Sequence, residues 1–153
     1  MQYTYGSRRH LPHLERPGAT YFVTFATLYR RELPDAARDL VLQAILHEHR
    51  VTSWLHCAVV MPDHVHLVVT IFDEWRVSAV MQRVKSVSAH RVNRLLNRRG
   101  ALWHDESFDR LIRRDESLRQ KSEYIAQNPS RKGLVTDLED YRWLWREWIE
   151  GRR

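Results

Sequence analysis

A chain of 153 residues that is 43% hydrophobic and 29% charged has the size and composition of one folded domain, which excludes a disordered protein. Cys57 is the only cysteine, so neither a disulfide framework nor a thiolate zinc cluster can form. The net charge of +6, with Arg supplying 22 of the 25 basic residues, favours a nucleic-acid partner, although a coding bias toward Arg would produce the same composition.

Segments that target proteins to membranes are missing from the sequence. No run of 18 apolar residues occurs, and residues 1–9 lack the apolar core of a secretion signal. Together with the single cysteine, this predicts a cytoplasmic protein without a membrane partner. We expect one domain over residues 1–153.

The first 18 residues form a segment of their own. Residues 1–18 are basic, are interrupted by prolines and show neither helical nor strand periodicity. We therefore predict an N-terminal arm whose Arg8, Arg9 and Arg16 help to recognise nucleic acid.

Strands and one helix follow the arm. Aromatic and β-branched residues predict a strand over 21–27, and apolar residues at steps of three and four predict a helix over about 36–50. The apolar runs 53–61 and 64–71 are separated only by Pro62-Asp63, which predicts an antiparallel hairpin.

Two histidines open the second arm of this hairpin. In a strand, His64 and His66 point to one face, and their Cα atoms lie roughly 6.6 Å apart at about 3.3 Å per residue. Both rings could then bind a single cation. A pair of histidines on a half-buried strand can equally be a coincidence without any metal.

The next segment, about 75–99, has apolar residues at helical spacing and a basic opposite face. Arg83 and Lys85 belong to that face, and no acidic residue occurs between positions 75 and 99. A helix face that is only solvated normally mixes charges of both signs. The two interpretations of this face are therefore a solvated surface and a contact with phosphates.

The C-terminal third is predicted to contain one strand, one helix and a tail. Alternation over 107–113 predicts the last strand. A helix capped by Asp115 should follow and run to about Gln127, because Pro129 disfavours its continuation. The Trp-rich tail, 137–153, is expected to pack or to form a short helix.

The order strand, helix, strand, strand, helix, strand, helix predicts an α+β domain of the ferredoxin-like split βαβ type. Its antiparallel sheet should carry helices on one face, with an extra helix that bears Tyr124.

Tyr124 and Asn128 are four residues apart and share a face of that helix. His64, His66 and the amide oxygen of Asn128, or of Gln127 instead, could hold Mg²⁺ or Mn²⁺ in an open site that suits phosphate chemistry better than structural zinc. A polarised phosphodiester could then be attacked by the Tyr124 hydroxyl. The ordinary alternatives are a half-buried core tyrosine and an asparagine that caps the helix.

These residues resemble the HUH single-strand DNA transposases with one catalytic tyrosine, most closely the REP-associated tyrosine transposases. The resemblance covers roughly residues 8–143. Its motifs are Pro62-Asp63 with His64-Val65-His66, Tyr124-Ile125-Ala126-Gln127-Asn128-Pro129, Gly133-Leu134-Val135, Tyr21-Phe22-Val23-Thr24-Phe25, Trp103, Phe108-Asp109-Arg110 and Ile112-Arg113.

The resemblance implies DNA transposition and recombination by cleavage of single-stranded DNA near a hairpin. By position, Tyr124 takes the 5′ phosphate and releases a 3′ hydroxyl, His64 and His66 bind the metal, and Asn128 stands where the third ligand falls. Mobile relatives carry Gln there, so Asn128 requires a closer helix or holds the metal more loosely. The tail also departs from the family pattern.

Two other functions are compatible with the sequence: a hairpin-binding protein that has lost turnover, and a hydrolase in which water attacks. We expect a monomer, with a homodimer as the alternative.

Overall fold

The computed structural model describes residues 3–5, 17–113 and 117–147 of the chain. Arg8, Arg9, Arg16 and Asp115, which the sequence analysis singles out, lie outside these described residues. No helix in the described part of the chain is both long enough and apolar enough to cross a membrane.

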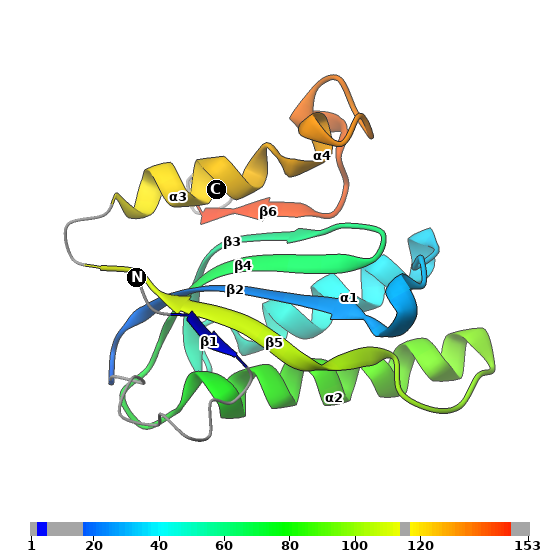
Figure 1. Ribbon diagram of the computed structural model, residues 1–153, viewed down its shortest axis with the longest axis horizontal. Helices are drawn as coiled ribbons and strands as arrows, with labels where there is room; N and C mark the ends of the chain where they lie inside the picture. Colours follow the sequence, from blue (N-terminus) through cyan, green and yellow to red (C-terminus); the bar gives the residue numbers. More distant parts are fainter. Residues whose placement is uncertain (1–2, 6–16, 114–116, 148–153) are drawn as a thin grey trace.

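A six-stranded antiparallel sheet organises the molecule, in the order β1-β5-β2-β4-β3-β6 (Figure 1). Its four inner strands and the two long helices have the ferredoxin-like topology, so the predicted fold class is confirmed. In chain order the elements are β1 (Tyr3–Tyr5), β2 (Thr20–Thr27), the 3-10 turn η2 (Leu28–Arg30), α1 (Asp35–Glu48), β3 (Ser53–Val60), β4 (His64–Ile71), α2 (Val77–Leu96), β5 (Trp103–Leu111), α3 (Leu118–Ala126), α4 (Asn128–Arg131), η3 (Leu138–Asp140) and β6 (Leu144–Arg146).

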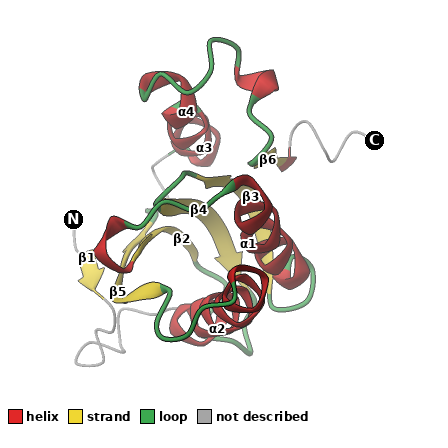
Figure 2. Cartoon of the chain, turned by 90° about the vertical axis from the view of Figure 1, so that its right-hand side faces the viewer, coloured by secondary structure: helices red, strands yellow, loops and turns green. Residues whose placement is uncertain are grey.

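The helices cover both faces of the sheet. Helices α1 and α2 lie on one face, and α3 with α4 lies on the other (Figure 2). The main core lies between the sheet and the first pair, where β4 contributes Val65, Leu67, Val69 and Ile71, each at most 2% exposed. Burying each such side chain stabilises the fold by about 1.5 to 3 kcal/mol. The alternate positions of β4 therefore face α3.

Two strands were missed by the predictions. The arm contains β1, which pairs with β5 from Tyr3 opposite Arg110 to Tyr5 opposite Phe108. The tail contains β6, which pairs with β3, so β5 is not the last strand. Each added strand has three residues, too few for alternation to be read in a sequence, and each is defined by pairing with a distant strand.

The start of the tyrosine-bearing helix also differs from the prediction. Ser117 occupies the N-cap, and its hydroxyl accepts a hydrogen bond from the backbone N–H of Gln120 at 3.1 Å. Helix α3 ends at Ala126, near the predicted end, and the chain turns at once into the single turn α4 with Pro129 near its start. Proline is tolerated there because the first turn of a helix needs no N–H bond.

Candidate active site

The predicted histidine pair lies at the start of β4 with both side chains on the α3 face of the sheet. The centroids of the His64 and His66 rings are 4.8 Å apart, and their planes meet at 79°. Neighbouring strand β2 places Ala26 opposite His64 and Thr24 opposite His66. The two rings are therefore close enough to approach one cation together, as the alternation predicts.

A carboxylate sets the orientation of the first ring. His64 Nδ1 lies 2.7 Å from Oδ1 of Asp63, and Arg30 Nε lies 3.0 Å from Oδ2 of the same carboxylate. Burial opposes ionisation of Asp63, but the hydrogen bonds from His64 and Arg30 outweigh it and lower its pKa. Because an ionised carboxylate only accepts, His64 Nδ1 must donate, which leaves the Nε2 lone pair available.

The second ring is more enclosed. His66 Nδ1 lies 2.8 Å from the Thr24 hydroxyl, and the Phe22 ring stacks on the imidazole with centroids 5.7 Å apart. Burial, followed by electrostatic interactions with His64 and Arg131, lowers the pKa of His66 to about 3. His66 is therefore neutral near pH 7, and neutral imidazole is the form that binds a metal.

Packing of α3 against the sheet brings the tyrosine to a cavity whose lining includes His66 but not His64. Ile125 and Ala126 are 1% exposed and pack on Cys57 and Val68 of the sheet. Tyr124, the neighbour of Ile125, is 62% exposed, so its hydroxyl is not enclosed in the core. A cavity of about 390 Å³ lies beside it, lined by Phe22, His66, Tyr124, Ile125, Asn128, Arg131 and Lys132.

Of the two candidate third ligands, the structure places only one in the cavity lining. Asn128 is 7% exposed and lines the cavity, whereas the Gln127 side chain is exposed and does not. Within residues 3–5, 17–113 and 117–147, no group of three or more His, Cys, Asp or Glu side chains could hold a metal. Asn128, rather than Gln127, therefore stays the candidate third ligand.

Arg131 and Lys132 were not singled out from the sequence. The Arg131 guanidinium lies 4.2 Å from the centroid of the Tyr124 ring, and it donates to the Tyr124 carbonyl oxygen at 3.0 Å and to Asn128 Oδ1 at 3.2 Å. The spacing could have revealed it, because Arg131 follows Asn128 by three residues and Tyr124 by seven. One guanidinium thus contacts both residues that the sequence placed on this face.

The predicted DNA-binding residues of α2 lie on the opposite side of the sheet. Arg83 Nε donates to the buried Glu48 carboxylate at 3.0 Å, and the Arg83 guanidinium lies 5.0 Å from the Trp75 ring centroid. Lys85 Nζ donates to the His104 carbonyl at 2.9 Å and to the Ser107 hydroxyl at 3.2 Å. Both residues therefore connect α2 to its neighbours in the fold.

Replacing Lys85 with Met is expected to lower the free energy of unfolding by about 1 to 3 kcal/mol, because acceptors on β5 lose a charged donor. Urea unfolding followed by circular dichroism measures this change. Gln82→Met on the exposed side of α2 is the matched control and should leave stability within about 0.5 kcal/mol. Weaker DNA binding by a Lys85→Met protein of unchanged stability would instead support the phosphate contact predicted from the sequence.

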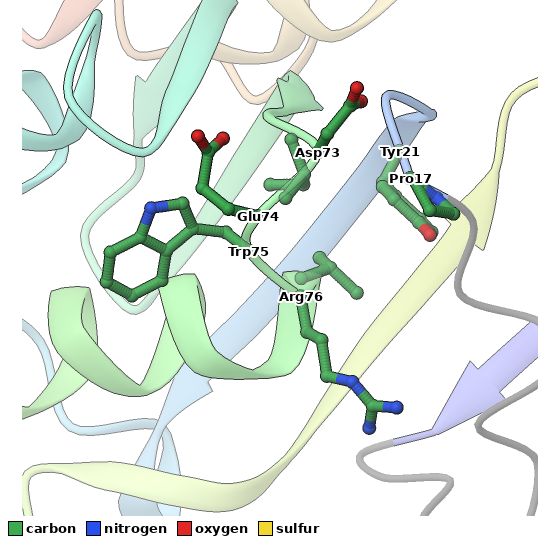
Figure 3. Close-up of a pocket in the computed structure, with 8 residues that line it drawn as sticks. Pro17, Tyr21, Asp73, Glu74, Trp75 and Arg76 are labelled. Atoms are coloured by element: carbon green, nitrogen blue, oxygen red, sulfur yellow. The ribbon is translucent and has the colours of Figure 1, made fainter.

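A second cavity, of about 240 Å³, lies where β4 leads into α2. Pro17, Tyr21, Asp73, Glu74 and Arg76 are among its lining residues (Figure 3). Its two carboxylates repel phosphate, whereas the cavity beside Tyr124 carries Arg131 and Lys132. We therefore assign the candidate active site to the cavity beside Tyr124.

Comparisons with known proteins bear on the whole chain. Residues 17–128 match the model of the family described as transposase IS200 like. Among solved structures, the chain is similar to a REP-associated tyrosine transposase bound to a REP hairpin, with a TM-score of 0.71 and 22% identity over 85% of this chain and 78% of that chain. A candidate transposase from Deinococcus radiodurans R1 aligns with a TM-score of 0.49 and 21% identity over 69% of this chain and 87% of that chain. No curated protein matches the chain.

Proposed function

The chain belongs to the IS200-like transposase family, and on this premise we propose that it cleaves and rejoins hairpin-forming single-stranded DNA through a covalent link to Tyr124. The family implies a DNA-cleaving enzyme. The observation that carries the finer proposal is the cavity beside Tyr124, where an exposed phenol, His66 and Asn128 meet from three separate elements.

The proposed reaction is a transesterification. The Tyr124 hydroxyl oxygen attacks a backbone phosphorus, loses its proton to solvent, and displaces the 3′ oxygen, which leaves as a hydroxyl. One phosphate ester bond forms as another breaks, so the 5′-phosphotyrosine retains the energy of the broken phosphodiester bond. A 3′ hydroxyl can later attack it and rejoin the strand without ATP.

His64, His66 and Asn128 would hold a divalent cation, Mg²⁺ or Mn²⁺. Their fit rests on the His64 ring, whose Nδ1 is hydrogen-bonded to Asp63 so that Nε2 would take the cation, on the neutral His66 ring beside it, and on the amide of Asn128 at the cavity that His66 lines. When bound, the cation supplies Lewis acidity that polarises the phosphate. Arg131 and Lys132 line this cavity and would bind the phosphate from the helix side.

The proposed substrate is a single strand that forms hairpins. Support comes from the solved structure of a protein with this fold bound to a REP hairpin, and from the Arg content of the chain. The basic arm with Arg8, Arg9 and Arg16 remains predicted to help recognition. We propose a monomer, because His66 and Tyr124 line one cavity within a single chain. We also propose that it acts in the cytoplasm, which suits a chain with a single cysteine.

The proposal is tested by incubating the purified protein with labelled hairpin oligonucleotides in Mg²⁺ or Mn²⁺. We expect a complex that resists denaturing electrophoresis and a free 3′ hydroxyl fragment. Binding that is unaffected by chelators, with no cleavage of any hairpin substrate, would instead indicate a DNA-binding protein without turnover.

Arg131 is expected to position Tyr124 as well as to bind phosphate. Arg131→Ala removes the guanidinium from the Tyr124 ring and from Asn128, so we expect the rate of adduct formation at saturating DNA to fall by about 10- to 100-fold. Arg131→Lys keeps the charge but cannot make the same pair of hydrogen bonds. Relative to Arg131→Ala, it should restore DNA affinity more than the rate of adduct formation. Equal recovery of both would contradict a positioning role.

A further inference from the structure

The turn that follows β2 presents an aromatic ring to solvent in a strained backbone. Tyr29 is 85% exposed, and both Tyr29 (φ 60°) and Arg30 (φ 55°) adopt the left-handed conformation. For a bulky residue this conformation is strained, and the exposed ring recovers little of that cost by burial. Stability alone would favour Gly or Asn here, so the ring requires another explanation.

Hydrogen bonds fix this turn to the loop that precedes the histidine strand. The backbone N–H of Thr27 donates to the Asp63 carbonyl at 2.9 Å, and that of Leu33 donates to the Pro62 carbonyl at 2.7 Å. The side chain of Arg30 reaches the same loop through its ion pair with Asp63. The turn, the β3–β4 loop and the end of α2 all lie at one end of the molecule (Figure 1, right).

Positive charge gathers around the exposed ring. Arg30 and Arg31 follow Tyr29 directly and are exposed, with Glu32 as the acidic residue of the turn. The backbone N–H of Leu28 donates to the Leu102 carbonyl at 2.8 Å, which places the segment after α2 beside the turn. Arg98 belongs to that segment, and its guanidinium is held there by hydrogen bonds to Asn93 Oδ1 at 2.5 Å and to the Ala101 carbonyl at 3.4 Å.

We propose that Tyr29 is a stacking platform for a base of the single-stranded DNA that passes the histidine site, with Arg31 contacting a neighbouring phosphate. This rests on the proposed function, because it takes the same strand as ligand. An exposed aromatic ring flanked by cations is the arrangement that binds single strands with little sequence preference, since every base has a π-face. Because backbone hydrogen bonds hold the turn in place, little backbone conformational freedom is lost when DNA binds.

The test distinguishes contacts with bases from contacts with phosphates, and it measures DNA binding without strand cleavage. Binding of fluorescent oligo(dT) and of an abasic oligonucleotide of equal length is measured in EDTA, in a Tyr124→Phe background. Tyr29→Ala should weaken oligo(dT) binding by roughly 5- to 150-fold and leave abasic binding within about twofold. Arg31→Ala should weaken both probes, whereas Arg91→Ala, which removes an equal charge from an exposed position of α2, should weaken neither appreciably.

Two further variants exclude a folding defect. Tyr29→Trp keeps a ring and should retain oligo(dT) binding, while Tyr29→Gly relieves the backbone strain and should raise the midpoint of thermal unfolding yet bind as weakly as Tyr29→Ala. Unchanged oligo(dT) binding by Tyr29→Ala, equal losses on both probes, or no measurable binding of oligo(dT) by the Tyr124→Phe parent would each overturn the proposal. None of these outcomes bears on whether Tyr124 forms an adduct, which is measured separately.

Discussion

Replacing Tyr124 with Phe is expected to abolish the covalent protein–DNA adduct while leaving hairpin binding nearly unchanged. The substitution removes only the hydroxyl, and the remaining ring can still lie against Arg131 and the cavity. Because a phenylalanine ring has no oxygen to form an ester, adduct formation should fall by at least about 10³-fold. Denaturing electrophoresis of labelled hairpin DNA measures the adduct, and fluorescence anisotropy measures binding.

Ser86→Ala is the control for this substitution. It removes a hydroxyl from an exposed position of α2, on the opposite side of the sheet from Tyr124, and should leave the adduct intact. An undiminished adduct in Tyr124→Phe would refute the assignment of the nucleophile. Free 5′ phosphate ends without any adduct in the parent protein would indicate attack by water, with Tyr124 only positioning the substrate.

Replacing His66 with Ala is expected to reduce strand cleavage by about 10²-fold or more, since the proposed cation site loses one of its two imidazoles. Chelation by EDTA should cause a similar loss in the parent, and added Mn²⁺ or Mg²⁺ should restore cleavage there but not in the variant. The quantity measured is the initial rate of 3′ hydroxyl fragment release at saturating hairpin DNA.

His90→Ala is the control for this change, because His90 is exposed on α2 and far from the cavity in the fold. It should cleave DNA at the parent rate. Cleavage by His66→Ala that equals the parent rate, or cleavage by the parent that persists in EDTA, would refute the cation site. Mixing Tyr124→Phe with His66→Ala tests the monomer, since a site built within one chain predicts no recovery of activity.

Much of the fold could be predicted from local patterns. Alternation in β2 and β4 reflects a sheet with one face in the core, and three- and four-residue spacing in α1 and α2 reflects helices that pack on that face. Strands β1 and β6 escaped prediction because pairing with β5 and β3, rather than any local periodicity, defines them. The prediction of Asp115 as the cap of α3 was wrong, because both Asp and Ser are residue types that cap helices and the cap is Ser117.

The candidate site, like the fold, could be predicted from the sequence only in part. Because strand alternation is a local property, the sequence by itself determined that His64 and His66 share a face, and its motifs determined the family. Which face of the sheet α3 covers depends on contacts of Ile125 and Ala126 with β3 and β4, more than fifty residues away. Only the tertiary structure therefore decided that Tyr124, Asn128 and Arg131 meet His66 at one cavity, because no local spacing encodes the approach of a helix to a distant strand.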